Sequence, residues 1–234
     1  MTTHKRLPVG VIGVGRYAMG YHLPFLQRSP DADLVAIHRR SPDQRAAAAA
    51  EFDVPHAFGD YLELLDAVEL DAVIVSGPQG LHHEYCMAAL ERGLHVLVDK
   101  PWVMRSADAE EELALAEEKG LTLSVAYNRR LDSANMYARG VIHSGGLGQP
   151  IYATGLQLGF VPPSVSPWQF DPELGGGPLY GRGAHMADLL PWTTGLTPIE
   201  VSCRLIHDEE LPVDVGGTIT LTMENDVLGQ ITSL

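Results

Sequence analysis

The stretch VGVIGVGRYA at residues 9–18 decides how the first part of this chain folds. An apolar run leads into Gly13-Val14-Gly15-Arg16-Tyr17-Ala18, which has the pattern G-x-G-x-x-A, and a helical pattern follows. In such a turn the first glycine permits a tight bend, the second lets a pyrophosphate approach the backbone, and the small third residue lets helix and strand pack closely. A glycine turn that binds nothing is the alternative interpretation, but the strand–turn–helix context favours a dinucleotide-binding turn made by these residues.

Short apolar runs alternate with helical patterns through the first half of the chain. We expect strands at residues 8–13, 34–38, 71–75, 95–98 and 121–127, and helices at residues 17–28, 43–52, 61–67, 81–92 and 107–119. Strands that are apolar along their length and separated by helices predict a parallel sheet that is covered on both faces. Residues 1–126 are therefore predicted to form a doubly wound α/β domain, a Rossmann fold that binds a dinucleotide.

The pattern changes after residue 126. Two more helices are expected at residues 131–143 and 184–193, among strand-like segments at residues 151–160, 199–206, 217–223 and 227–233. Grouped strands with few helices predict a mainly antiparallel sheet in an α+β domain. Residues 127–234 are thus predicted to form a substrate and oligomerisation domain. The chain stops inside an alternating strand, so we expect this domain to be incomplete at its C-terminus.

The end of the second predicted strand indicates which dinucleotide is bound. NAD binders usually place a carboxylate there, where it holds the ribose hydroxyls. This strand instead ends in AIHRRS, so Arg39, Arg40 and Ser41 follow it. Two guanidinium groups and a hydroxyl suit a 2′-phosphate. The alternative is that both arginines contact only solvent. We therefore expect NADP(H) to be preferred, with NAD(H) as the second choice.

The composition excludes several classes of partner. The formal net charge of −14 repels phosphate backbones, which argues against general nucleic-acid binding. No uncharged run approaches the length of a membrane span, and the N-terminus shows no signal-peptide pattern. The two cysteines are isolated in sequence and suit a reduced state in the cytosol. We expect a cytoplasmic protein with a small-molecule substrate. We expect no metal, because no Cys/His/Asp cluster has the spacing of metal ligands.

Three further motifs resemble those of the Gfo/Idh/MocA oxidoreductases, the family of glucose–fructose oxidoreductase and inositol dehydrogenase. The segment DAVIVSGPQGLHHEYCMAALERGLHVLVDKP at residues 71–101 ends in Asp99-Lys100-Pro101, where that family has E-K-P. VAYNRRL at residues 125–131 resembles the family's transition into the substrate domain. WQFDPELGGGPLYGRGAHMADLLPW at residues 168–192 resembles its glycine-rich block with a histidine.

The resemblance implies a nicotinamide enzyme that oxidises or reduces a hydroxyl or carbonyl carbon, often on a sugar or polyol. It implies that Lys100 and His185 are catalytic, with Lys100 polarising the reacting oxygen and His185 relaying the proton. The alternatives are that Lys100 is a surface lysine in a turn and that His185 is a core-facing or capping histidine. The residues expected beside the cofactor are Gly77, Pro78, His82, Lys100 and Pro101, and those expected beside the substrate are Asn128, Trp168, Tyr180 and Arg182. Members of the family commonly associate through the second domain's sheet, so a homodimer or homotetramer is expected.

The chain departs from the family pattern at two positions. Gly181 stands where the family usually has an aspartate, four residues before His185, and Gln169 replaces an arginine after Trp168. Tyr180 or Arg182 could supply the missing polar group to a substrate oxygen or carboxylate. A different substrate from the simple polyols, or a protein that binds a dinucleotide as a non-catalytic sensor, also fits the loss of the carboxylate.

Overall fold

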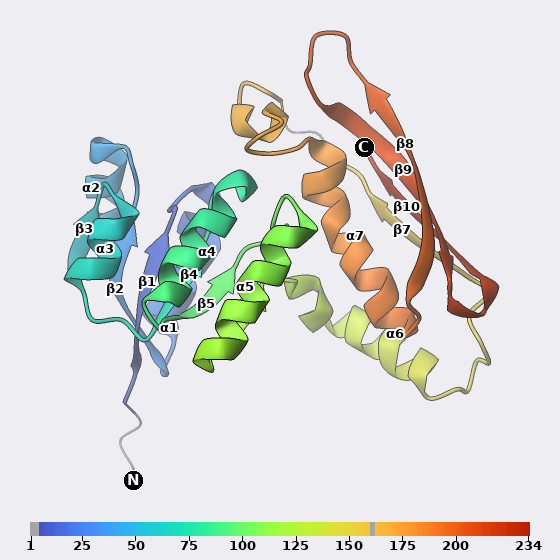
Figure 1. Ribbon diagram of the computed structural model, residues 1–234, viewed down its shortest axis with the longest axis horizontal. Coiled ribbons are helices and arrows are strands. Elements are labelled where there is room, and N and C mark those ends of the chain that lie inside the picture. Colours follow the sequence, from blue (N-terminus) through green and yellow to red (C-terminus); the bar gives the residue numbers. More distant parts are fainter. Residues whose placement is uncertain (1–4, 160–161) are drawn as a thin grey trace. The chain divides into compact units, whose positions relative to one another are not determined.

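The computed structural model describes residues 5–159 and 162–234 and divides into two compact units (Figure 1). The first unit is Met1–Ala126 and the second is Tyr127–Leu234. Phe160, the last residue of a predicted strand, and residues 1–4 lie outside the described residues. Among the described residues, no helix combines the length and the apolarity that a membrane crossing needs.

The first unit contains a parallel sheet of six strands in the order β3-β2-β1-β4-β5-β6. The strands are β1 Leu7–Ile12, β2 Ala32–His38, β3 His56–Phe58, β4 Ala72–Val75, β5 His95–Val98 and β6 Leu123–Val125. The order reverses between β1 and β4, which is where open α/β sheets bind their ligands. The predicted parallel sheet is confirmed, and β3 is an addition that is too short to show a periodicity.

Helices cover both faces of this sheet (Figure 1). They are a π-helical turn Ala18–His22 continued by α1 Leu23–Arg28, then α2 Pro42–Glu51, α3 Tyr61–Ala67, a 3₁₀ turn Gln79–Leu81 continued by α4 His82–Glu91, and α5 Ser106–Lys119. Side chains of β4 alternate between two cores: Val73 and Val75 pack with α3, α4 and α5, whereas Ile74 packs with α1 and α2. A doubly wound layer arrangement follows from this alternation.

The second unit is built from a four-stranded mixed sheet in the order β7-β10-β9-β8, with α7 along one face (Figure 1). Its elements are a 3₁₀ turn Asn128–Leu131, α6 Ser133–His143, β7 Tyr152–Gln157, a 3₁₀ turn Pro167–Phe170, α7 Pro178–Thr194, β8 Pro198–His207, β9 Asp214–Met223, a 3₁₀ turn Glu224–Asp226 and β10 Val227–Ser233. Strands β8, β9 and β10 are antiparallel neighbours, and β7 runs parallel to β10. The predicted α+β fold is confirmed, although α7 begins earlier than expected.

Candidate active site

The glycine turn of the first unit lies at the carboxyl ends of β1 and β4. Gly13 has φ +81°, and a Cβ there would come within 1.7 Å of the Ser76 carbonyl oxygen. Only glycine can therefore follow β1 while the chain after β4 passes this close. Val14 and Ala18 are buried under the turn, whereas Arg16 and Tyr17 are exposed and Gly15 is partly exposed. Gly13, Val14 and Gly15 thus form the turn at the strand end, and the other three predicted residues begin the helix that follows.

His38, the last residue of β2, holds this turn in place. The Gly13 N–H donates to His38 Nδ1 at 3.2 Å, and the Val14 N–H donates to the His38 carbonyl oxygen at 2.9 Å. Because Nδ1 accepts, the neutral ring carries its proton on Nε2. Burial lowers the pKa of His38, which keeps the ring neutral. His38 was not among the predicted site residues, since a histidine at a strand end carries no distinguishing pattern.

Three arginines surround the end of β2, and no carboxylate ends the strand. Arg39 donates through Nη2 to Gln44 Oε1 at 2.7 Å, while Arg40 is exposed. Arg45 Nη1 donates to the carbonyl oxygens of Arg39 at 2.9 Å and Arg40 at 3.2 Å, which fixes the bend between β2 and α2. Ser41 occupies the N-cap position of α2. The sequence had indicated Arg39, Arg40 and Ser41, but not the helical Arg45.

A buried carboxylate joins three loops at the same edge of the sheet. Asp99, directly after β5, is 8% exposed. Its Oδ2 accepts from the Ser76 hydroxyl at 2.6 Å, and its Oδ1 lies 2.8 Å from His22 Nε2 on the π-helical turn. The predicted lysine, Lys100, is the next residue and is partly buried. The amino-acid sequence had identified Asp99 only as a variant of a motif residue.

His82 connects the chain after β4 with the chain after β5. Its ring is 1% exposed, with Nδ1 2.9 Å from the Pro101 carbonyl oxygen and Nε2 3.3 Å from the Gly77 carbonyl oxygen. The Lys100–Pro101 peptide bond is cis. Burial lowers the pKa of His82, so the neutral ring with a proton on Nδ1 makes the shorter bond. Pro78 comes immediately before the 3₁₀ turn that starts α4. Gly77, His82 and Pro101 are therefore brought together, and His82 acts by fixing two loops.

The glycines of the second unit build the start of α7. Gly177 has φ +98°, and a Cβ there would lie 2.2 Å from Asp214 Oδ2. The Asp214 side chain reaches the helix from β9 and accepts from the Leu179 N–H at 2.9 Å. Gly175 lies against the backbone beside Trp168, where a Cβ would be 2.3 Å from the Trp168 carbonyl oxygen. Asp214 was not among the predicted residues, because it lies 35 positions from its partner.

His185 lies one turn after Gly181 on α7, so positions 181 and 185 share a helix face. Burial raises the pKa of the neighbouring Tyr180 to about 12, with a further contribution from Tyr127. Its phenol therefore stays protonated and can donate a hydrogen bond. Asp188, which lies three residues beyond His185, forms a bidentate pair with Arg130. Asn128, which was also expected near the substrate, is exposed and lies on the 3₁₀ turn Asn128–Leu131.

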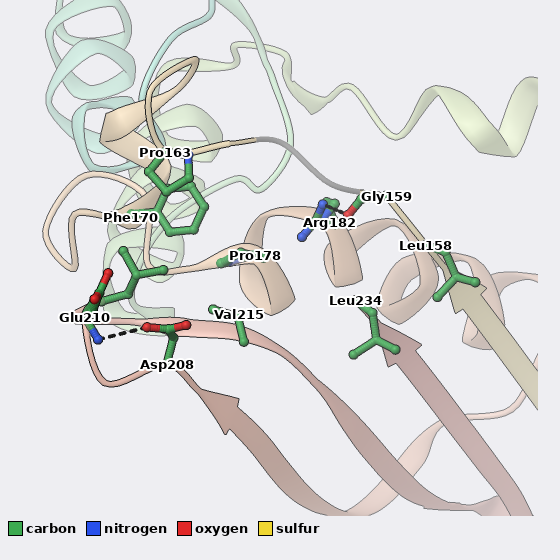
Figure 2. A pocket seen from close by; sticks show the side chains of 11 residues that line it. Leu158, Gly159, Pro163, Phe170, Pro178, Arg182, Asp208, Glu210, Val215 and Leu234 are labelled. Atoms are coloured by element: carbon green, nitrogen blue, oxygen red, sulfur yellow. Dashed lines mark hydrogen bonds between the residues drawn. The ribbon is translucent and has the colours of Figure 1, made fainter.

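Arg182 lies beside a cavity of about 820 Å³ in the second unit (Figure 2). Its guanidinium donates to the Gly159 carbonyl oxygen, and burial lowers its pKa. Phe170 and Pro178 form apolar parts of the cavity wall. Asp208, from the acidic loop after β8, also lines the cavity. Arg182 thus lines a cavity, while His185 of the same helix does not line it.

Two sequence profiles match this chain. Residues 7–127 match the profile of the oxidoreductase family with an NAD-binding Rossmann fold, and residues 136–233 match the GFO/IDH/MocA C-terminal domain. The chain belongs to the Gfo/Idh/MocA oxidoreductase family.

Curated relatives support this membership of the Gfo/Idh/MocA family, and a solved structure shares the fold. The chain is 31% identical over 192 residues to the 1,5-anhydro-D-fructose reductase of Ensifer adhaerens, covering 82% of this chain and 57% of the relative. It is 32% identical over 219 residues to the dTDP-3,4-didehydro-2,6-dideoxy-alpha-D-glucose 3-reductase of Streptomyces violaceoruber, covering 94% and 64%. The fold matches that of scyllo-inositol dehydrogenase from Lactobacillus casei with bound NAD(H) and scyllo-inositol, with a TM-score of 0.84, 20% identity and coverage of 98% and 71%.

The chain therefore spans less than two thirds of the length of these curated Gfo/Idh/MocA relatives. Within the part of the chain that the structure describes, no group of three or more His, Cys, Asp or Glu side chains could hold a metal ion.

Proposed function

We propose that this chain belongs to an NADP(H)-dependent oxidoreductase that transfers hydride to or from a hydroxyl or carbonyl carbon of a sugar-like or other small polar substrate. This proposal rests on the arrangement of residues at the edge of the first sheet where the parallel strands end. There, a glycine turn follows β1 at the point where strand order reverses, and Lys100 follows β5. Membership of the family and the names of the sugar-modifying relatives support the type of reaction.

The preference for NADP(H) rests on charge at the end of β2. With His38 as its last residue, the strand offers no carboxylate to accept from a ribose 2′-hydroxyl. Arg39 and Arg40 are instead available for a 2′-phosphate, and Arg45 fixes the backbone that carries them. NAD(H), the cofactor of the solved neighbour, is the second choice because its ribose gains nothing from these guanidinium groups.

The dissociation constants of NADPH and NADH test this preference. Replacing both Arg39 and Arg40 with alanine is expected to weaken NADPH binding by at least about tenfold, since each charge-assisted bond contributes about 1.5–3 kcal/mol. NADH binding should change little. Arg28→Ala is the matched control, because Arg28 ends α1, away from the end of β2. Equal losses for both cofactors would contradict the assignment of a 2′-phosphate site.

The proposed chemistry assigns roles to three side chains of this chain. When bound, a nicotinamide cofactor would supply or accept the hydride. The Lys100 amine donates a hydrogen bond to the reacting oxygen and stabilises the charge that develops there, and the His185 imidazole relays the hydroxyl proton. The protonated Tyr180 phenol beside Gly181 donates to a second substrate oxygen.

A substrate panel, followed by the absorbance of the reduced cofactor, tests these roles. Lys100→Met and His185→Asn are each expected to lower kcat by about 100-fold or more, in line with general acid–base contributions. Lys119→Met, at the end of α5, is the control lysine, because its amine donates to the Glu91 carbonyl oxygen. Cofactor binding without turnover of any alcohol, aldehyde or ketone on the panel would favour the sensor hypothesis.

We also propose that the free face of the second sheet pairs with a second copy of the chain, in a homodimer or homotetramer. The face opposite α7 carries Tyr152 and Leu228, which are neighbours in register and 51% and 52% exposed, and Leu156, which is 62% exposed. Thr218, Thr220 and Thr222 of β9 share that face, and on β8 Glu200 and Arg204, in register with Thr222 and Thr218, add one charge of each sign. Sedimentation of the purified protein tests this, with Leu228→Lys expected to yield monomers.

A further inference from the structure

The carboxylate of Asp99 links the cofactor turn to the proposed catalytic lysine. Each of its oxygens has a partner: the Ser76 hydroxyl at 2.6 Å on one side and His22 Nε2 at 2.8 Å on the other. The side chains of His22 and Asp99 are 14% and 12% exposed, so the pair is largely shielded from water. Bonds to a charged group in such a place are strong and directional. The three segments after β1, β4 and β5 are therefore held at one point.

The π-helical turn brings His22 to this point. The Leu23 N–H donates to the carbonyl oxygen of Ala18, five residues back, instead of four. π-Turns are rare and occur frequently at functional sites. The π-helical turn comes directly after the glycine turn, and in a strand–turn–helix of this kind the pyrophosphate binds at the N-terminus of the helix. His22 thus sits on the same short segment that would bind phosphate.

We propose that Asp99 is a positioning residue, which together with His22 couples the occupied glycine turn to the placement of the Lys100 amine. Asp99 and Lys100 are adjacent in the chain, so fixing the Asp99 side chain fixes the direction in which Lys100 leaves β5. A phosphate at the glycine turn orders the π-helical turn, and the His22–Asp99 bond carries this order to Lys100. This inference rests on the proposed function for the role of Lys100, but the coupling can be measured without turnover.

Acetylation of Lys100, followed by mass spectrometry, reads this coupling directly. In the wild-type protein, saturating NADPH is expected to slow acetylation of Lys100 by about tenfold. Asp99→Asn keeps the shape but removes the charge, and His22→Ala removes the partner. Both variants should bind NADPH within about threefold of the wild type, yet lose most of the protection of Lys100. His22→Gln, which can place an amide N–H near the position of Nε2, should restore it.

Asp66→Asn is the matched control. It makes the same substitution at a carboxylate that pairs with Arg92 at 2.7 Å, between the ends of α3 and α4. Lys100 protection should be unchanged in this variant. Where a substrate is found, kcat of Asp99→Asn should fall on the order of 100-fold at an unchanged KM for NADPH, since a misplaced catalytic group costs about that much.

Wild-type protection of Lys100 in Asp99→Asn or in His22→Ala would overturn the proposal. If Asp99→Asn does not fold, Ser76→Ala carries the test, because it removes one of the two partners and leaves the charge; intact protection there would count against the proposal. If the wild type binds no NADPH, the proposed function fails. The positioning role of Asp99 is then tested without cofactor: the rate of Lys100 acetylation should differ at least threefold between the wild type and Asp99→Asn. Equal rates would overturn the positioning role.

Discussion

Gly177→Ala is expected to destabilise the second unit severely. The residue has φ +98° and ψ 163°, a region that residues with a Cβ almost never adopt, and this costs about 1–3 kcal/mol. The new Cβ would also lie 2.2 Å from Asp214 Oδ2. Asp214 must then move, and the bond that its Oδ1 accepts from the Leu179 N–H is lost. A hydrogen bond to a charged group contributes about 1.5–3 kcal/mol.

The two effects together predict a loss of about 2.5–6 kcal/mol in the free energy of unfolding. Urea denaturation followed by circular dichroism measures it. Gly140→Ala is the matched control in the same unit: this exposed glycine lies inside α6 with nothing within 4 Å of an added methyl group, so alanine should stabilise by about 0.5–1 kcal/mol. Removing the carboxylate with Asp214→Ala should relieve the clash, so Gly177→Ala should cost less in that background. A loss below about 1 kcal/mol in the wild-type background would refute the reasoning.

Three further outcomes follow from the structure. Gly13→Ala should abolish NADPH binding and lower the melting temperature, because its Cβ would lie 1.7 Å from the Ser76 carbonyl oxygen; normal binding in a titration would contradict this. Burial raises the pKa of Glu112, so just above the pH at which carboxyl groups ordinarily titrate the folded state binds more protons than the unfolded state. In that pH range the free energy of unfolding, compared with that of Glu112→Gln, should therefore fall as pH rises. Urea denaturation at several pH values measures this slope, and a slope of the opposite sign would argue against it. Gly181→Asp restores the carboxylate one turn before His185, and turnover that appears only in this variant would identify the natural protein as a sensor.

Elements whose formation depends on neighbouring residues were predictable. The strand–turn–helix around Gly13 followed from a pattern of small residues. The helix expected at residues 107–119 ends at Gly120, whose left-handed conformation is common for glycine at a helix C-terminus. The apolar runs of β4 and β5 predicted a sheet covered on both faces, because strands buried on both sides have no polar face to alternate.

Elements that depend on distant partners were not predictable. α7 was expected to begin at residue 184, but it begins at Pro178, because Asp214 of β9 provides an acceptor for the Leu179 N–H at that end. The glycines of that segment have a low helix propensity, and this long-range bond outweighs it. The parallel pairing of β7 with β10 likewise joins segments far apart in the chain.

Lys100 and His185 were singled out by motifs that resemble those of the family. The sequence by itself determined the alternation of strands and helices and the glycine turn. These depend on the spacing of apolar and small residues, which sets the backbone locally. Only the tertiary structure decided that His38 binds the turn and that Asp99 joins His22 to Ser76. A hydrogen bond between residues 25 or 77 positions apart depends on how strands line up in the sheet, and no local pattern encodes that alignment.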